Sequence, residues 1–145
     1  MHRPLLILMA EDDADDRLLA REALFECPRT AELRFVEDGE ELLDYLGHSG
    51  KYSFPEDAPR PDLILLDLNM PRLDGREALR RIKSTEEFRR IPIVVMTTSN
   101  SPEDINLSYD AGANSFITKP LSFSELVELM KLVGNYWLES VALPV

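Results

Sequence analysis

Short apolar runs alternate with longer amphipathic stretches along the chain. The runs are rich in Leu, Ile and Val, and a run such as Leu63–Leu66 lacks the alternation of polar and apolar residues found in half-exposed strands. We therefore expect strands that are covered on both faces. The predicted strands are Leu5–Ala10, Leu33–Val36, Leu63–Leu66, Ile93–Thr97 and Ser115–Thr118.

The stretches between these runs predict helices. Apolar residues at helical spacing are Leu18, Leu19, Ala23 and Leu24, then Leu42, Leu43 and Leu46, then Leu79 and Ile82, then Leu126, Met130, Val133 and Trp137. Helix starts are indicated by capping-box pairs and by a cap residue before a first-turn proline. These are Asp38 with Glu41, Asp74 with Glu77, Ser122 with Glu125, and Ser101 with Pro102. Gly and Pro residues between His48 and Pro61 predict a loop of about a dozen residues.

Five strands that alternate with five helices predict consecutive βα units and a parallel sheet. Right-handed crossovers then place helices on both faces, which is a doubly wound α/β fold. The chain has 145 residues, of which 44% are hydrophobic, so we expect one domain over 1–145 with a sizeable core. Residues 135–145 extend beyond the length that such a fold needs.

Charge and apolar run length narrow the choice of partners. The net charge of −11 repels nucleic acid phosphates and acidic membranes, so protein partners are expected. The longest apolar run, Leu5–Ala10, is too short to span a membrane. Because a single cysteine cannot form an internal disulfide, a reducing compartment, the cytoplasm, is the expected location.

The candidate chemistry lies where the predicted strands end, because open α/β sheets bind ligands outside the carboxyl ends of their strands. Glu11-Asp12-Asp13 follows the first strand and Asp67 follows the third. The fourth ends at Thr97, and Lys119 follows the fifth. Grouped carboxylates repel one another unless a cation or protons intervene. With oxygen ligands only, Mg²⁺ fits best and leaves room for phosphate oxygens.

Each of these residues alone also has an ordinary structural explanation. A strand-end Asp such as Asp67 can cap a loop, Thr97 is a β-branched strand residue, and Lys119 can be a surface lysine. Asp13 is expected to be a solvent-facing charge rather than a third ligand. The four features in this order along the chain are what favour phosphoryl chemistry.

From Leu5 to about Val133 the sequence resembles the response-regulator receiver domains, or CheY-like family. The matching stretches are Ile7-Leu8-Met9 through Glu11-Asp12, Leu65 through Pro71 with Asp74-Gly75, Ile91-Pro92-Ile93 through Thr97, and Gly112-Ala113 through Lys119-Pro120. The resemblance implies a flavodoxin-like sheet with strand order 2-1-3-4-5. It also implies a phosphoacceptor that assists only its own phosphorylation and dephosphorylation, and not an enzyme in the usual sense.

The resemblance implies a role for each residue of the metal and phosphoryl site. Asp67 is the expected phosphoacceptor. Glu11 and Asp12 form the acidic pair, with Asp12 the favoured direct ligand of Mg²⁺. Asp67 and the backbone carbonyl of Asn69 complete the protein ligands.

A second group of residues is expected to carry the switch. Thr97 hydrogen-bonds the phosphoryl group and Lys119 pairs with it. Phe116 occupies the position of the switch aromatic, where tyrosine is commoner, and turns inward when Thr97 moves. The Lys119–Pro120 peptide bond is expected to be cis.

The long loop and the C-terminal tail are similar to those of small receivers that pair with phytochrome histidine kinases. A sensor histidine kinase, or a histidine phosphotransfer protein, is the expected partner, and the chain is expected to act without an output domain. Trp137, Val141 and Leu143 extend an apolar stripe that either covers the protein's own core or forms a homodimer contact.

Three other functions are compatible with parts of the pattern. The first is a receiver-fold binding module that is never phosphorylated. The second is an aspartate-nucleophile phosphatase, but Asn69 stands where such enzymes place a second acid. The third is a flavodoxin-like electron carrier, whose cofactor phosphate the acids after the first strand would repel.

Overall fold

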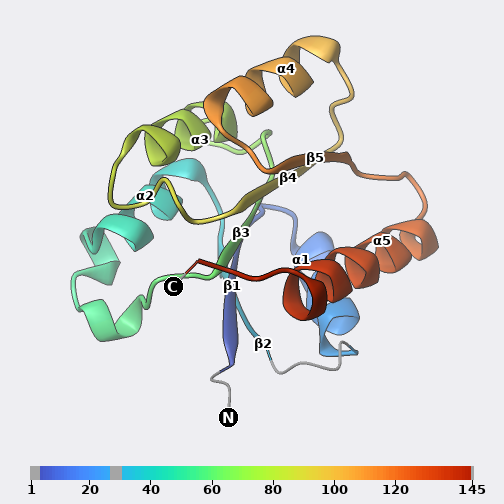
Figure 1. The fold of residues 1–145 in the computed structure, drawn as a ribbon, viewed down its shortest axis with the longest axis horizontal. Coiled ribbons are helices and arrows are strands. Elements are labelled where there is room, and N and C mark those ends of the chain that lie inside the picture. The colour runs from blue at the N-terminus through green and yellow to red at the C-terminus, as the bar shows by residue number, and fades with distance from the viewer. Residues whose placement is uncertain (1–3, 27–30, 145) are drawn as a thin grey trace.

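A computed structural model describes residues 4–26 and 31–144 and shows one five-stranded parallel sheet (Figure 1). The strands are β1 (Leu5–Ala10), β2 (Ala31–Val36), β3 (Leu63–Leu66), β4 (Ile93–Thr97) and β5 (Ser115–Thr118). The helices are α1 (Ala14–Phe25), α2 (Gly39–Gly47), α3 (Gly75–Ser84), α4 (Pro102–Ala111) and α5 (Phe123–Asn135). The order β2-β1-β3-β4-β5 confirms the predicted doubly wound arrangement.

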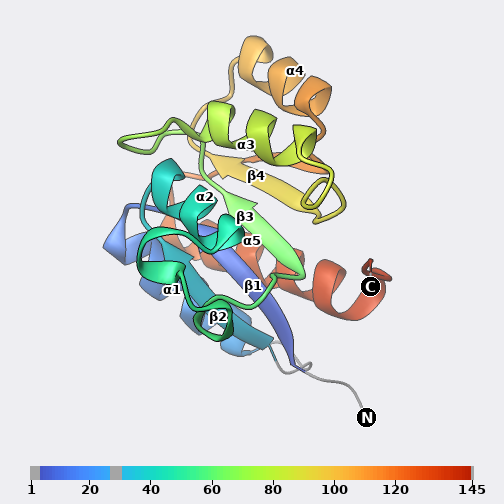
Figure 2. The same cartoon turned by 90° about the vertical axis from the view of Figure 1, so that its left-hand side faces the viewer.

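The sheet lies between two layers of helices (Figures 1 and 2). Helices α1 and α5 pack together on one face, and α2, α3 and α4 follow one another on the other face. Successive residues of each central strand enter opposite layers. In β3, Leu63 and Leu65 pack under α1 and α5, whereas Ile64 and Leu66 pack under α2 and α3. This division explains why the run is apolar without alternation.

Strand β2 differs from its prediction because it starts at Ala31 rather than Leu33. It lies at the edge of the sheet, where Glu32 is exposed and Arg34 donates a 2.9 Å hydrogen bond to it. Edge strands can begin with polar residues, and a prediction based on apolar runs does not include them.

The predicted helix caps are all present in the structure. The cap side chains accept hydrogen bonds from backbone N–H groups in the first turns of their helices; they are Asp38 for α2, Asp74 for α3, Ser101 for α4 and Ser122 for α5. Asp13 caps α1 in the same way, with its Oδ1 2.8 Å from the amide nitrogen of Asp15. It is exposed and so fits the expected solvent-facing charge.

The long connection before β3 is held in place by its own hydrogen bonds. The Tyr45 hydroxyl donates to the Pro59 carbonyl at 2.8 Å, and His48 Nε2 lies 2.8 Å from the Ala58 carbonyl. The predicted loop is therefore an ordered surface segment that contains two short 3₁₀ turns, Gly50–Tyr52 and Pro55–Asp57.

The C-terminal tail continues α5 through one π-helical turn, Tyr136–Ser140. Trp137 is only 9% exposed and packs in the core between the sheet, α1 and α5. Val141 and Leu143 are partly buried against the same core. The placement favours the covering of the protein's own core over a dimer contact, which stays a prediction.

Two further expectations concern the backbone and the membrane. All peptide bonds of the described residues are trans, so the prediction of a cis Lys119–Pro120 bond is wrong. The trans isomer is the lower of the two in energy. Within residues 4–26 and 31–144, none of the helices has the length and apolar character needed to cross a membrane.

Candidate functional site

The carboxyl ends of four strands bring the predicted site residues together. Glu11 and Asp12 follow β1, Asp67 follows β3, Thr97 ends β4 and Lys119 follows β5. The chain crosses from β1 to β2 on one side of β1, and β3 lies on the other side. The strand order therefore reverses at β1, next to the carboxyl ends that carry these residues. Open α/β sheets form their ligand crevice at such a point.

Three carboxylates at this edge form a compact oxygen cluster. Each of Glu11, Asp12 and Asp67 offers an oxygen, and these atoms lie within 4.8 Å of one another. Glu11 is 1% exposed and Asp67 8%, whereas Asp12 is exposed. Because all the donors are carboxylate oxygens and one side is open, the cluster fits a hard divalent cation that retains water ligands.

The Lys119 ammonium lies among carboxylates. Its Nζ donates to Glu11 Oε1, to Asp16 Oδ2 at 2.9 Å and to Asp67 Oδ2 at 3.1 Å. Burial alone would lower the pKa of Lys119, but the contacts with Glu11, Asp16 and Asp67 together outweigh it and raise the pKa above its ordinary value. Lys119 therefore carries its charge inside the protein.

Glu11 is the most deeply buried carboxylate of the site. Burial raises the pKa of Glu11 to about 7, against the lowering effect of the Lys119 ammonium. Its second oxygen accepts the Asp13 N–H at 3.1 Å, and its backbone carbonyl accepts Arg17 Nη1 at 2.8 Å. These bonds hold the turn between β1 and α1 against the sheet edge.

Asn69 connects Asp67 to Thr97. Its backbone N–H donates to Asp67 Oδ1 at 3.0 Å, and its Nδ2 donates to Thr97 Oγ1 at 3.3 Å. Thr97 is fully buried. The hydroxyl of Thr97 thus already has a polar partner beside Asp67.

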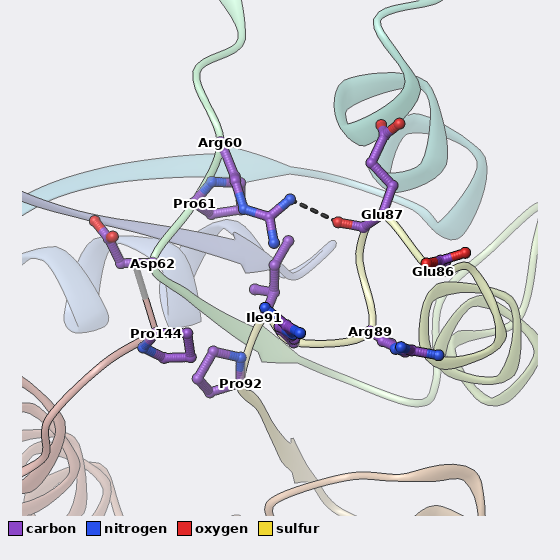
Figure 3. A pocket seen from close by; sticks show the side chains of 10 residues that line it. Arg60, Pro61, Asp62, Glu86, Glu87, Arg89, Ile91, Pro92 and Pro144 are labelled. Atoms are coloured by element: carbon purple, nitrogen blue, oxygen red, sulfur yellow. Dashed lines mark hydrogen bonds between the residues drawn. The ribbon is translucent and has the colours of Figure 1, made fainter.

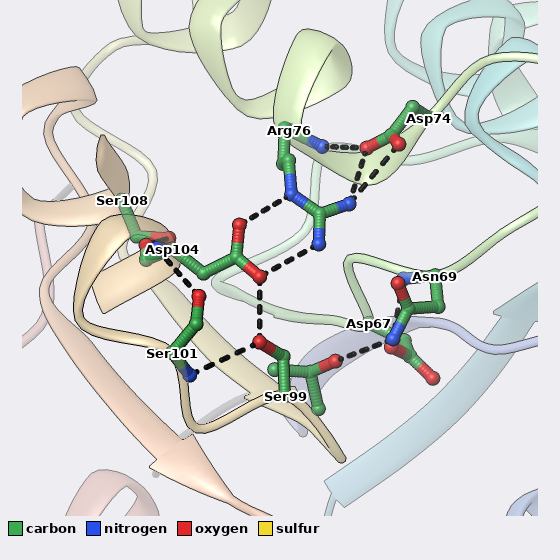
Figure 4. Close-up of polar contacts among 9 residues, drawn as sticks. Asp67, Asn69, Asp74, Arg76, Ser99, Ser101, Asp104 and Ser108 are labelled. Carbon is green, nitrogen blue, oxygen red and sulfur yellow. Dashed lines mark hydrogen bonds and ion pairs between the residues drawn. The ribbon is translucent and has the colours of Figure 1, made fainter. Parts of the chain in front are cut away.

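A polar network ties the loop after β4 to α3 and α4 (Figure 4). Arg76 binds Asp104 through two bonds, of 2.6 Å from Nε and 2.8 Å from Nη2, and its Nη1 lies 3.0 Å from Asp74 Oδ2. Ser99, two residues after Thr97, donates to Asp104 Oδ2 at 2.5 Å. The hydrogen bond from Arg76 and the one from Ser99 hold the pKa of Asp104 well below its usual range. Sequence reasoning missed this network, because Arg76 and Asp104 lie on different helices.

Helix α3 begins directly against the backbone of Asp67, and this needs a glycine. A Cβ at Gly75 would lie 2.3 Å from the Asp67 carbonyl oxygen and 2.7 Å from Leu68 Cα. Any side chain there would displace the backbone that carries Asp67.

Phe116, the expected switch aromatic, is partly buried against the core that underlies α2 and α3. Its N–H donates to the Tyr109 hydroxyl at 3.1 Å, which joins β5 to α4.

A cavity of about 510 Å³ lies at the opposite, amino ends of β3 and β4 (Figure 3). Its lining includes Arg60, Asp62, Glu87, Ile91 and Pro92. None of the carboxylates grouped around Lys119 lines it.

The fold and this site define a family. The family model of the response regulator receiver domain matches residues 7–131, and the chain belongs to that family. The chain is 40% identical over 141 residues to the response regulator Rcp1 of Synechocystis sp., a match that covers 97% of this chain and 94% of that protein.

Two solved structures extend the comparison. The Mn²⁺-bound form of response regulator Rcp1 has a TM-score of 0.93 at 39% identity and covers 98% of this chain and 100% of that one. The phosphorylated cyanobacterial phytochrome response regulator RcpA has a TM-score of 0.93 at 42% identity, with 99% and 100% covered. The receiver fold and the similarity to phytochrome response regulators are thus confirmed.

Proposed function

We propose that the chain acts in a two-component phosphorelay and accepts a phosphoryl group on Asp67 with Mg²⁺. The observation that supports this most directly is the position of the Asp67 carboxylate. It lies 3.1 Å from the Lys119 ammonium and belongs to the three-carboxylate cluster. The Asp67 nucleophile, the Lys119 ammonium and the carboxylates that can bind a metal ion therefore lie side by side. Phosphoryl transfer depends mainly on such positioning and on charge stabilisation.

The transfer itself needs one exchange of bonds. An Asp67 oxygen bonds to the phosphorus of a phosphohistidine as the phosphorus–nitrogen bond breaks, and the electron pair of that bond stays on the departing imidazole. Lys119 donates a hydrogen bond to a phosphoryl oxygen. The residues that would hold Mg²⁺ are Glu11, Asp12, Asp67 and the Asn69 backbone carbonyl. When bound, Mg²⁺ offsets the negative charge on the phosphoryl oxygens.

The switch begins at Thr97 in this proposal. Thr97 Oγ1 accepts from the Asn69 amide, and the Thr97 O–H turns to donate to a phosphoryl oxygen on Asp67, which is a strong acceptor because it is charged. The loop after β4 and α4 then move, and Phe116 packs inward behind Thr97. Phosphorylation thus biases a two-state element through new charge-assisted bonds.

Acetyl phosphate tests the acceptor directly. We expect one phosphate to be added to the wild-type chain with Mg²⁺, seen by intact mass, and none after a chelator is added. Asp67→Asn keeps the size of the side chain and should stay unmodified. Asp13→Asn is the matched control, because asparagine still caps α1, and it should be modified like the wild type. Folded wild-type protein without an adduct would contradict the proposal and favour an unphosphorylated binding module.

The proposed donor is a sensor histidine kinase of the phytochrome class, or a histidine phosphotransfer protein. The similarity to Rcp1 and to the phytochrome response regulator RcpA supports this choice. A reducing cytoplasm suits a chain with one cysteine. Incubation with autophosphorylated phytochrome kinases and with unrelated kinases tests the pairing, and equal transfer rates from both would contradict it.

A homodimer through the tail stays a separate prediction. Because Trp137 is buried in the core, a truncation before it would also destabilise the fold. Sedimentation of the full chain over a range of concentrations is therefore the cleaner test, and a monomer at every concentration would exclude the dimer.

A further inference from the structure

The Lys119 ammonium has no hydrogen left for another partner. An ammonium group has three N–H donors and no acceptor. Three carboxylates accept from Lys119 Nζ, on Glu11, Asp16 and Asp67. The Lys119 side chain is 5% exposed, so water does not supply an alternative arrangement. A phosphoryl oxygen on Asp67 must therefore compete with carboxylates for this ammonium.

Asp16 differs from the other two carboxylates. It is not part of the three-carboxylate cluster that Glu11, Asp12 and Asp67 form. It lies in the first turn of α1, where its own N–H donates to Asp13 Oδ1 at 3.1 Å. An acidic side chain is favourable at this end of a helix even without a cation.

Asp16 can also release Lys119 more easily than Glu11 can. The Asp16 side chain is 19% exposed, whereas that of Glu11 is 2% exposed. A buried Glu11 carboxylate that lost Lys119 would have no water to replace the ammonium, but Asp16 can turn toward water. Its contact with the ammonium, at 2.9 Å, is nevertheless shorter than the 3.1 Å contact of Asp67.

We propose that Asp16 is a positioning residue that competes with the phosphoryl group for Lys119. It holds the ammonium beside Asp67 before phosphorylation, and it weakens the pull of the ammonium on an incoming phosphoryl oxygen. The inference rests on the proposed function and deepens it, because it makes Asp16 a determinant of how readily Asp67 is modified.

Beryllofluoride with saturating Mg²⁺ is a suitable probe, because it forms a stable tetrahedral anion on an aspartate oxygen without hydrolysis. Asp16→Asn removes the charge and keeps an oxygen acceptor, and it should bind beryllofluoride about fivefold more tightly than the wild type. Asp16→Ala should show at least the same gain. Asp16→Glu, which restores the charge, should remain close to the wild type.

Asp15→Asn is the matched control. It removes one charge from the same helical turn, and the structure shows no contact between Asp15 and Lys119. Its affinity for beryllofluoride should equal that of the wild type. The rate of phosphorylation by acetyl phosphate should follow the same order among the four variants, which a merely structural role of Asp16 would not produce.

Three results would contradict the inference. The affinity of Asp16→Asn for beryllofluoride could be unchanged or weaker, the gain could be equal in Asp15→Asn, or Asp16→Glu could behave like Asp16→Asn. If the wild type binds no beryllofluoride, the proposed function itself fails. If the wild type binds and the variants do not differ, only the role of Asp16 fails.

Discussion

The two ends of the sheet both carry charged residues, but they use them differently. At the carboxyl end, Glu11, Asp67 and Lys119 are buried and contact one another through their side chains. At the amino end, Arg60 and Glu87 are exposed around the cavity of about 510 Å³ (Figure 3). There Arg60 Nη1 donates to the backbone carbonyl of Glu87 at 2.7 Å. Burial and mutual contact, rather than the number of charges, distinguish the site from the rest of the surface.

The buried carboxylates at the two ends show the same contrast. Asp62 at the amino end is 8% exposed, as Asp67 is at the other. Its Oδ2 accepts the Leu6 N–H at 2.8 Å and so ties the start of β3 to β1. Asp67 instead faces an ammonium and two carboxylates. The contact of Asp67 with Lys119 lets it respond to a charged ligand, whereas the bond that Asp62 accepts from Leu6 stabilises the pairing of β1 with β3.

Removal of the central cation should have the largest effect. Lys119→Ala leaves Glu11 and Asp67 buried without their ammonium, and we expect a loss of about 3–5 kcal/mol in the free energy of unfolding. Chemical denaturation without Mg²⁺ measures it. Arg60→Ala at the amino end is the control and should change stability much less, because its group is exposed. Equal losses would remove the contrast between the two ends.

Binding of Mg²⁺ at the carboxyl ends of the strands should have the second largest effect on the stability of the protein. At 100 times its dissociation constant a ligand adds about 2.7 kcal/mol to the stability of the form that binds it. Thermal unfolding with Mg²⁺ and with a chelator measures the gain. Asp12→Asn should lose most of it, since Asp12 belongs to the carboxylate cluster. Asp13→Asn should keep it, and an equal loss in both variants would point to a general charge effect.

The Arg76–Asp104 pair is intermediate in burial between the charged groups of the two ends, because its side chains are 28% and 16% exposed. Solvent screening should limit the cost of Arg76→Gln to about 1 kcal/mol at pH 7. Because the pKa of Asp104 is lowered in the folded protein, the pair contributes its full stability at pH values above the ordinary carboxyl pKa of about 4. It is lost as the pH falls through the lowered pKa.

Denaturation of the wild type and of Arg76→Gln between pH 7 and pH 3 tests this sign. The difference in stability should be constant down to about pH 4 and shrink below it. Arg80→Gln, which breaks an exposed pair with Glu77, is the control and should have a smaller effect at every pH. A difference that grew on acidification would contradict the assignment.

Much of the fold could be predicted from the sequence because the central strands are apolar on both faces. The bounds of β1, β3, β4 and β5 agree with the apolar runs. Helical spacing was less informative about burial. Leu18 keeps the apolar spacing of α1 and is 57% exposed, whereas Ala20 is fully buried. The rotation of a helix depends on what it packs against, and the spacing of apolar residues only approximates it.

The site residues at the strand ends could be predicted because the parallel topology brings those ends together. The partners supplied by helices could not. Asp16 meets Lys119, which lies 103 residues away, through the rotation of the first turn of α1. Arg76 meets Asp104 only through the packing of α3 beside α4. Such contacts depend on tertiary geometry that local patterns do not contain.

The distance along the chain between Glu11 and Lys119 has a consequence for synthesis. These residues are 108 positions apart, yet they share one ion pair. Contacts of such sequence separation form late, because the closure of a long loop precedes the gain from the contact. On the ribosome the acids after β1 emerge first and must wait for β5 to supply their counter-charge. Under the proposed function, a nascent chain would therefore be able to accept a phosphoryl group only after nearly all of its domain has been made and folded.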